Sequence, residues 1–160
     1  MPRHKLNDYQ LRDFAAEHLT YEVDMLLATA LLLGTGNHEL PMKNALLESF
    51  TIHLRALIDF LWESDNPRPD DAIATDYYAS TDKWHRVRPV FPTALDPARK
   101  RTAKEIVHLT YTRLTVTTEQ KRWNYFDMAN AITEALVEFR TNALPSRIGD
   151  ALLDLKRLGN

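Results

Sequence analysis

The N-terminal part of the chain has the hydrophobic spacing of one long amphipathic helix. Neither proline nor glycine occurs from Asn7 to Leu33, and apolar residues recur three and four positions apart. Gly34, Gly36 and Asn37 follow this stretch, and both residue types favour the end of a helix. The pattern therefore predicts one helix from Asn7 to Leu33. The apolar positions that define it are Leu11, Phe14, Ala15, Leu19, Met25, Leu26 and Ala30.

A second predicted helix runs from about Met42 to Glu63, after Pro41, and has two contrasting faces. With 100° per residue, its large apolar residues fall within an arc of about 120°, which we expect to be buried against the first and fourth helices. These residues are Leu46, Leu47, Phe50, Leu54, Leu57, Ile58 and Leu61. The opposite arc is expected to form a polar stripe of Asn44, Glu48, Thr51, Arg55, Asp59 and Trp62. His53 borders the apolar arc, where a buried, hydrogen-bonded histidine is expected rather than a ligand.

Residues 64–95 are rich in proline and show no sustained helical pattern. Four of the eight prolines lie there, at positions 67, 69, 89 and 92. A connection of this length is uncommon in a compact domain and is usually functional or flexible. One short helix is predicted from Asp70 to Ala79. Four apolar residues indicate that part of the connection packs on the body of the protein: Trp84, Val87, Val90 and Phe91.

The remainder of the chain predicts three further helices. Asp96-Pro97 is typical of a helix start, and this third helix is expected to continue to about Leu114. Thr115-Val116-Thr117-Thr118 are poor helix formers and interrupt it. A fourth long helix is predicted over residues 119–142, and Pro145 opens a short last one. The apolar positions of the last helix are Ile148, Leu152, Leu155 and Leu158.

No segment alternates apolar and polar residues as a half-buried strand does, so the predicted fold class is all-α. We expect a single domain, 1–160, built as an antiparallel helical bundle. Four principal helices and a short C-terminal helix would form it, with a long loop between helices two and three.

The composition excludes several classes of function. The 160 residues include no cysteine, which removes thiol catalysis, cysteine zinc sites and disulfide scaffolds. The four glycines, at positions 34, 36, 149 and 159, match no phosphate-binding loop, and no Gly-x-Ser-x-Gly element supports an activated nucleophile. The longest apolar stretch, Met25 to Leu33, is far shorter than the roughly 20 residues of a membrane span, and no secretory signal is recognisable. We expect a cytoplasmic protein without a cofactor.

The net charge of −2 conceals an uneven distribution of charge along the chain. Residues 1–82 hold 6 Lys and Arg against 14 Asp and Glu, whereas residues 83–104 hold 7 against 1. Two interpretations stay open: the basic segment attracts a phosphate backbone, or it pairs with the acidic first half of the same chain. Its cations are Lys83, Arg86, Arg88, Arg99, Lys100, Arg101 and Lys104.

The third predicted helix carries an arginine and a histidine on one face. Arg101 and His108 are two turns apart and separated by about 20° on the helical projection, with Lys104 beside them. A histidine in this setting can move a proton on a ribose 2′-hydroxyl, and an arginine can hold the phosphate and offset its developing charge. On the second helix, Glu48 and Arg55 are candidates to orient His108 or bind an anion. For both helices the alternative is a solvated polar face, with Arg55 and Asp59 as an i,i+4 ion pair.

The sequence Arg101-Thr102-Ala103-Lys104-Glu105-Ile106-Val107-His108 resembles the motif of HEPN domains, in which four to six residues separate an arginine from a histidine. The resemblance implies an all-α protein of a toxin–antitoxin or phage-defence type that cleaves RNA without metal. It implies Arg101 and His108 as the catalytic pair, assembled across a homodimer, and an antitoxin as a protein partner. Arg99, Lys100 and Lys104 would hold the RNA. A second match to the motif runs from Arg12 to His18, but its ends are about 120° apart on an ideal helix.

Two other functions are consistent with parts of the sequence. Glu105-Ile106-Val107-His108 has the Glu-x-x-His spacing of di-iron bundles, but the second copy that such a site needs is absent from the sequence, so no metal site is expected. The alternative to an enzyme is a non-catalytic helical module that binds another protein through its long loop and exposed aromatic residues. Those residues would be Tyr77, Tyr78 and Trp84.

Overall fold

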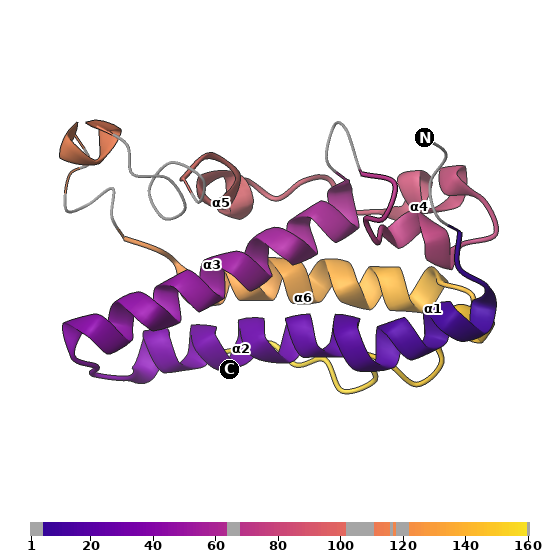
Figure 1. Cartoon of the computed structure of the whole chain (residues 1–160), viewed down its shortest axis with the longest axis horizontal. Helices are drawn as coiled ribbons and strands as arrows, with labels where there is room; N and C mark the ends of the chain where they lie inside the picture. Colours follow the sequence, from indigo (N-terminus) through magenta and orange to yellow (C-terminus); the bar gives the residue numbers. More distant parts are fainter. Residues whose placement is uncertain (1–4, 64–67, 102–110, 116, 118–121, 160) are drawn as a thin grey trace.

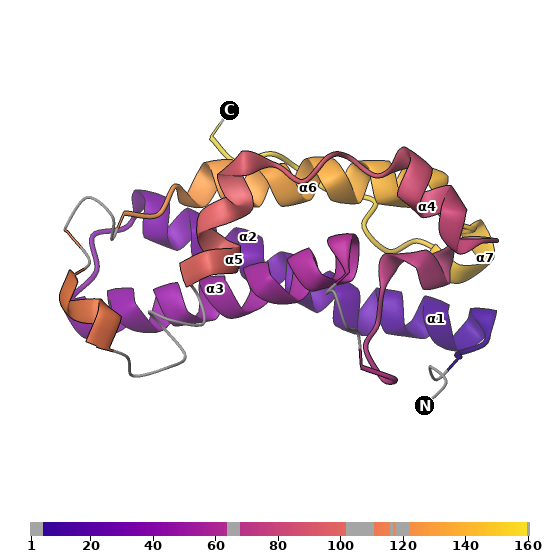
Figure 2. The same cartoon turned by 90° about the horizontal axis from the view of Figure 1, so that it is seen from above.

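The computed structural model describes residues 5–63, 68–101, 111–115, 117 and 122–159, and these residues confirm the predicted all-α class. No strand occurs among them. Three long helical segments lie along one another and form the body of the molecule (Figure 1 and Figure 2). In the part of the chain that is described, no helix combines the length and the hydropathy that crossing a bilayer requires.

The first long segment is helical throughout, as predicted, but contains one widened turn. It consists of α1 (Asp8–Phe14), the π-helix η1 (Ala15–Leu19) and α2 (Thr20–Thr35). Asn7 begins the segment with a capping box, in which its side chain accepts from Gln10 N and its N–H donates to Gln10 Oε1. At the other end of η1, the N–H of Thr20 reaches back five residues to the carbonyl of Ala15.

Helix α3 (Leu40–Trp62) packs on α2 and on α6 (Tyr125–Asn142) and buries its apolar arc between them. Phe50, Leu54, Leu57, Ile58 and Leu61 are buried as predicted, and Leu46 and Leu47 are half-buried. Close packing of α2 on α6 depends on Gly34, since a Cβ at that position would lie 2.6 Å from the ring of Phe126.

The predicted polar stripe of α3 is buried at Thr51 and partly covered at Trp62. Thr51 is fully buried, and its hydroxyl donates to the carbonyl of Glu48 at 2.9 Å, so the polar group is satisfied inside the helix. Trp62 is half-buried, and its Nε1 donates to the carbonyl of Pro89 at 3.0 Å. The long connection therefore covers the C-terminal end of this stripe.

The connection between α3 and α5 is held down by aromatic residues. It contains the 3-10 helix η2 (Ala74–Tyr77), α4 (Thr81–Val87) and the 3-10 helix η3 (Thr93–Leu95). The helix predicted from Asp70 to Ala79 is therefore reduced to one 3-10 turn, and α4 was not predicted. Of the four apolar residues expected to pack, Trp84 is buried, Val87 and Phe91 are half-buried, and Val90 is 92% exposed.

Phe139 of α6 lies at the centre of the aromatic cluster. The cluster comprises Phe60, Tyr77, Tyr78, Trp84 and Phe139, and the other four rings lie 5.2 to 6.0 Å from the ring of Phe139. The polar atoms of the cluster are satisfied by backbone carbonyls: Tyr77 donates to Leu11, Tyr78 to Phe139 and Trp84 to Leu61. Burial raises the pKa of both tyrosines, helped by the nearby carboxylates of Asp76 and Glu138, so both hydroxyls stay protonated donors.

The two last predicted helices are shorter than expected, whereas the third can be followed only over its first turns. Helix α5 (Asp96–Arg101) begins where expected, residues 102–110 lie outside the described residues, and Tyr111–Thr115 forms the 3-10 helix η5. The fourth predicted helix begins at Tyr125 rather than near residue 119. Helix α7 (Pro145–Ile148) ends after one turn because Gly149 takes a positive φ of 54°, which reverses the chain. The following segment runs back along α6, where Asn130 bonds to both the N–H and the carbonyl of Leu158.

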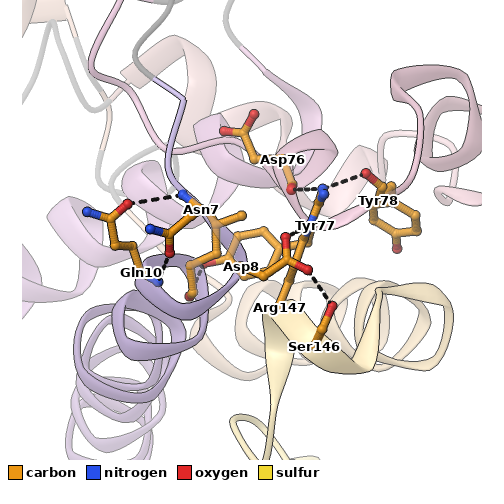
Figure 3. Close-up of polar contacts among 9 residues, drawn as sticks. Asn7, Asp8, Gln10, Asp76, Tyr77, Tyr78, Ser146 and Arg147 are labelled. Carbon is orange, nitrogen blue, oxygen red and sulfur yellow. Dashed lines mark hydrogen bonds and ion pairs between the residues drawn. The ribbon is translucent and has the colours of Figure 1, made fainter.

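A polar clasp joins α1 to α7 and to the connection (Figure 3). Arg147 donates through Nε to the carboxylate of Asp8 and through Nη1 to the carbonyls of Asp76 and Tyr78, each at 2.8 Å. Ser146 donates to the other carboxylate oxygen of Asp8 at 2.7 Å. The clasp therefore ties together three segments that are far apart in the sequence.

Acidification is expected to weaken this clasp. Hydrogen bonds from Ser146 and Arg147 hold the pKa of Asp8 below its ordinary value, against the opposing effect of desolvation. Because the pKa is lower in the folded state, the clasp contributes stability above about pH 4 and loses it as the pH falls through the folded-state pKa. Melting temperatures of the wild type and Asp8→Asn should therefore differ at pH 7 and converge as the pH falls below the lowered pKa of Asp8. Asp13→Asn, an exposed control on the same helix, should melt like the wild type, and a pH-independent gap for Asp8→Asn would contradict the expectation.

Candidate nucleic-acid interface

Arg101, at the C-terminal end of α5, is held in a defined position. Its guanidinium lies over the ring of Trp123, 4.3 Å from the centroid, and Nη1 donates to the carbonyl of Arg122 at 3.1 Å. Burial raises the pKa of Tyr125, and the positive charge of Arg101 opposes that shift. Arg101 therefore lies within electrostatic reach of the start of α6. Leu95 and Ala98, both fully buried, anchor η3 and α5 beneath it.

The other residues of the predicted catalytic face are placed only in part. Arg99 and Lys100 lie on α5, which packs on α3. Lys104 and His108 lie outside the described residues. The convergence of Arg101 with His108 therefore stays a prediction.

Of the supporting residues on α3, Arg55 forms an ion pair with Asp59. Arg55 Nε lies 2.8 Å from Asp59 Oδ2, which is the predicted i,i+4 pair, and both side chains are partly exposed. Glu48 is exposed about two turns before Arg55. The proposed contact of Glu48 or Arg55 with His108 is not tested by the described residues.

His53 confirms the prediction of a buried, hydrogen-bonded histidine. Its side chain is 10% exposed, and Nδ1 lies 2.7 Å from Oε2 of Glu22, 31 residues earlier in the chain. The ring of Tyr21 meets the imidazole edge-on at 5.5 Å. The sequence indicated the burial of His53 but not its carboxylate partner, because that partner lies on another helix.

The second arginine–histidine match does not form a converging pair. Arg12 lies over the ring of Tyr9 and lines a cleft beside Asp150 and the turn after α7. His18 packs against Phe14, with ring centroids 5.1 Å apart, and lines a different cleft next to α3. The two side chains therefore lie on different faces of the same helical segment.

Two cations of the basic segment, Lys83 and Arg86, have no carboxylate partner among the described residues. Both are exposed on α4. Arg86 donates to the carbonyl of Asp82 at 3.2 Å, and Arg88 lies 3.5 Å from the carbonyl of Trp62. In the described part of the chain, one contact with a carboxylate joins the basic segment to the acidic residues 1–82: His85 Nε2 lies 3.2 Å from Glu63 Oε1.

Helices α4 and α5 lie on the same side of the layer formed by α3 and α6 (Figure 1). The sequence did not predict α4, so Lys83 and Arg86 were not placed on a helix. The available signal was Ser80 followed by Asp82, since a serine before a first turn with an acidic residue is typical of a helix start. Two basic stretches that the sequence separates are therefore brought to one side of the fold.

Neither a metal-binding cluster nor a known relative accompanies this surface among the described residues and the proteins compared. Within the described ranges, no three His, Asp or Glu side chains are arranged to hold a metal ion. No protein-family model matches the chain, and neither the curated proteins nor the solved structures provide a match.

Proposed function

We propose that this chain is a HEPN-like, RNA-binding protein that cleaves RNA without a metal ion. The observation that carries the proposal is the exposure of Lys83 and Arg86 on α4, without carboxylate partners among the described residues, on the side of the fold that also bears α5. Such cations attract a phosphate backbone without regard to base sequence. Arg99, Lys100 and Lys104 would extend the same basic surface.

The proposed mechanism rests on the sequence prediction of a third helix from Asp96 to about Leu114. In such a helix His108 would lie two turns beyond Arg101, on the same face. His108 takes the proton of a ribose 2′-hydroxyl, and the 2′-oxygen then attacks the adjacent phosphorus while Arg101 offsets the charge that develops on the phosphate. The P–O5′ bond breaks, and the departing 5′-oxygen takes a proton from the solvent. The ring of Trp123 orients the Arg101 guanidinium before substrate binds, which lowers the cost of positioning it. A homodimer that brings together two such pairs, a cytoplasmic location and an antitoxin-like partner belong to the same proposal.

The aromatic surface expected of a protein-interaction module is buried. Tyr77, Tyr78 and Trp84 were expected to be exposed, but they are 1%, 2% and 0% exposed. They are buried because each ring packs on Phe139 and each polar atom donates to a backbone carbonyl of the body. These three aromatic residues hold the connection in place and are not a docking surface.

The test is cleavage of single-stranded RNA by the full chain in the presence of EDTA. His108→Ala is expected to lower the cleavage rate by about 10²- to 10⁴-fold, the usual contribution of a general acid or base. Arg101→Ala should lower it comparably, and Arg101→Lys, which keeps the charge but loses the planar guanidinium, should restore only part of the rate. RNA association in a gel shift should weaken steeply as salt rises.

The second motif provides a matched control. Arg12→Ala and His18→Ala remove the same residue types from a similar spacing and should leave cleavage unchanged, because these side chains line different clefts. A wild-type protein that cleaves no RNA, or Arg101 and His108 variants that cleave as well as the wild type, would refute the proposal. Melting temperatures of all variants should be compared, since Arg101 also packs on Trp123.

A further inference from the structure

Helix α3 carries a stripe of exposed and half-exposed residues opposite its buried apolar arc. At 100° per residue, the members of the stripe fall within an arc of about 100°. Ile52, in the middle of this arc, is 57% exposed. Figure 2 shows α3 along one long side of the molecule, with α6 toward the opposite side. The surface, called the Ile52 stripe below, consists of Ala45, Glu48, Ile52, Arg55, Ala56 and Asp59.

Two charged groups of the Ile52 stripe have capacity for a further partner. Glu48 is exposed, and within the described residues its carboxylate forms neither an ion pair nor a hydrogen bond. Arg55 binds Asp59 through Nε alone, and its two Nη groups form no hydrogen bond in the described part of the chain. A planar guanidinium can bind two carboxylates along different edges, so Arg55 can accept a second one.

The order of these charges makes the stripe complementary to itself. When two α3 helices lie antiparallel with residues 51 and 52 at the centre, residue 48 of one helix lies level with residue 55 of the other. Glu48 then faces Arg55 of the partner subunit, and the two-fold axis repeats this pair. In the same alignment Asp59 lies level with Asn44 of the partner subunit, which is uncharged. A parallel alignment would instead place each charge beside its own counterpart, which is repulsive.

The centre and the area of the stripe suit a weak dimer. Ile52 lies next to the proposed axis, between the small side chains of Ala45 and Ala56, so the two backbones can approach closely. The contact along residues 45–59 is about 21 Å long. Tyr21 of α2 is 53% exposed and adjoins the stripe through its contact with His53. Together these surfaces bury about 1,000–1,200 Å² over both copies, the lower limit of specific interfaces, which corresponds to a Kd of about 10–100 µM.

We propose that a second copy of this chain docks antiparallel on the Ile52 stripe. Glu48 of each copy pairs with Arg55 of the partner subunit, and Ile52 packs across the two-fold axis. This interface gives a position to the homodimer included in the proposed function. It does not depend on RNA cleavage, because no residue of the stripe belongs to the proposed Arg101–His108 pair. Glu48 and Arg55 thereby act in assembly rather than in orienting a histidine.

Cross-linking tests which surfaces meet, because the chain contains no cysteine of its own. Under mild oxidation at about 100 µM protein, Ile52→Cys should form a disulfide-linked dimer, since residues beside a two-fold axis can reach the Cα–Cα distance of about 4.4–6.8 Å that a disulfide needs. Val137→Cys, at a 48% exposed position on α6, is the matched control and should remain largely monomeric. Equal cross-linking of the two variants would reflect random collision and would count against the interface.

Sedimentation equilibrium of the full chain between about 1 and 300 µM measures the association itself. The wild type should pass from 18.5 kDa toward twice that mass. Glu48→Arg and Arg55→Glu should each weaken dimerisation at least about tenfold, because like charges then face each other at two symmetric places. The double reversal should regain the wild-type affinity within about threefold. Asp13→Arg, on a surface beside the C-terminal turn, should leave the affinity unchanged.

The proposal is overturned if the wild type stays monomeric up to about 300 µM, if either single reversal dimerises as tightly as the wild type, or if the folded double reversal does not recover. Circular dichroism at about 1 µM, where the chain is monomeric, checks that every variant is folded, and substitutions of Ile52 have little effect on unfolding there. RNA cleavage is assayed separately. A dimer that cleaves no RNA refutes the proposed function alone, whereas cleavage by a strictly monomeric chain refutes the interface alone.

Discussion

Replacing Phe139 with alanine is expected to lower the free energy of unfolding by about 3–5 kcal/mol, the range measured for large aromatic residues in protein cores. Phe139 is fully buried on α6, and the rings of Phe60, Tyr77, Tyr78 and Trp84 all pack on it. No other ring in the described structure contacts so many partners, so the truncation leaves a cavity that several side chains border. Denaturant unfolding followed by circular dichroism measures the loss.

The position of Trp84 provides a second measurement of the same variant. Trp84 is completely buried against Phe139 in the wild type, so its fluorescence should shift to longer wavelength if the connection loosens. Val137 lies two residues earlier on α6 and is 48% exposed. The control variant Val137→Ala should therefore change the unfolding free energy by no more than about 0.5 kcal/mol. A loss below about 1 kcal/mol for Phe139→Ala would show that the cluster does not hold the connection in place.

Leu54→Ala is expected to destabilise the protein by about 2–5 kcal/mol through the other half of the core. Leu54 is fully buried in the apolar arc of α3, between α2 and α6. The substitution removes three carbon atoms from a site enclosed by helices that cannot all move inward, so part of the cost comes from the residual cavity. A thermal or denaturant melt measures it.

The matched control for Leu54 lies two residues earlier on the same helix. Ile52 is 57% exposed, so Ile52→Ala removes a similar side chain without opening the core. It should cost less than about 1 kcal/mol, mainly through local contacts. Equal losses for the two variants would mean that the apolar arc of α3 is assigned to the wrong face.

Helices with regular apolar spacing were predictable from the sequence because their pattern is local. The segment from Asn7 to Leu33 and the buried arc of α3 are both confirmed, since each follows from residues three and four positions apart. Neither pattern indicates the π turn at Ala15–Leu19, which adds a residue to one turn without changing the composition. The predicted last helix was longer than the observed helix α7, because spacing alone does not indicate that Gly149 adopts a positive φ.

Burial in the connection was not predictable in the same way. Tyr77, Tyr78 and Trp84 occur in a segment without a helical period, and their burial depends on Phe139, which lies 55 or more positions later. The carbonyls that satisfy their polar atoms also belong to other elements. Exposed aromatic residues in a proline-rich loop were therefore the natural expectation, and tertiary packing overrides it.

In the candidate site, too, contacts within one helix were predictable from the sequence, whereas contacts between elements were not. Residue types and spacing on one helix indicated Arg101 with His108, and Arg55 with Asp59, of which the second pair is confirmed. The support of Arg101 by Trp123 and the pairing of His53 with Glu22 join residues from different elements, so the sequence offered no local signal for them. Sequence spacing thus identified candidates, whereas the structure supplied their partners.

The clasp between Asp8 and Arg147 has a consequence for the order in which the protein is synthesised and folded. These residues are 139 positions apart, and α1 packs mainly on α7. At ribosomal rates of about 5–20 residues per second, α1 is made roughly 7 to 28 seconds before its partner emerges. During that interval the apolar face around Leu11 has no native cover from α7, so the nascent chain depends on other contacts, or on a chaperone, to keep that face from aggregating.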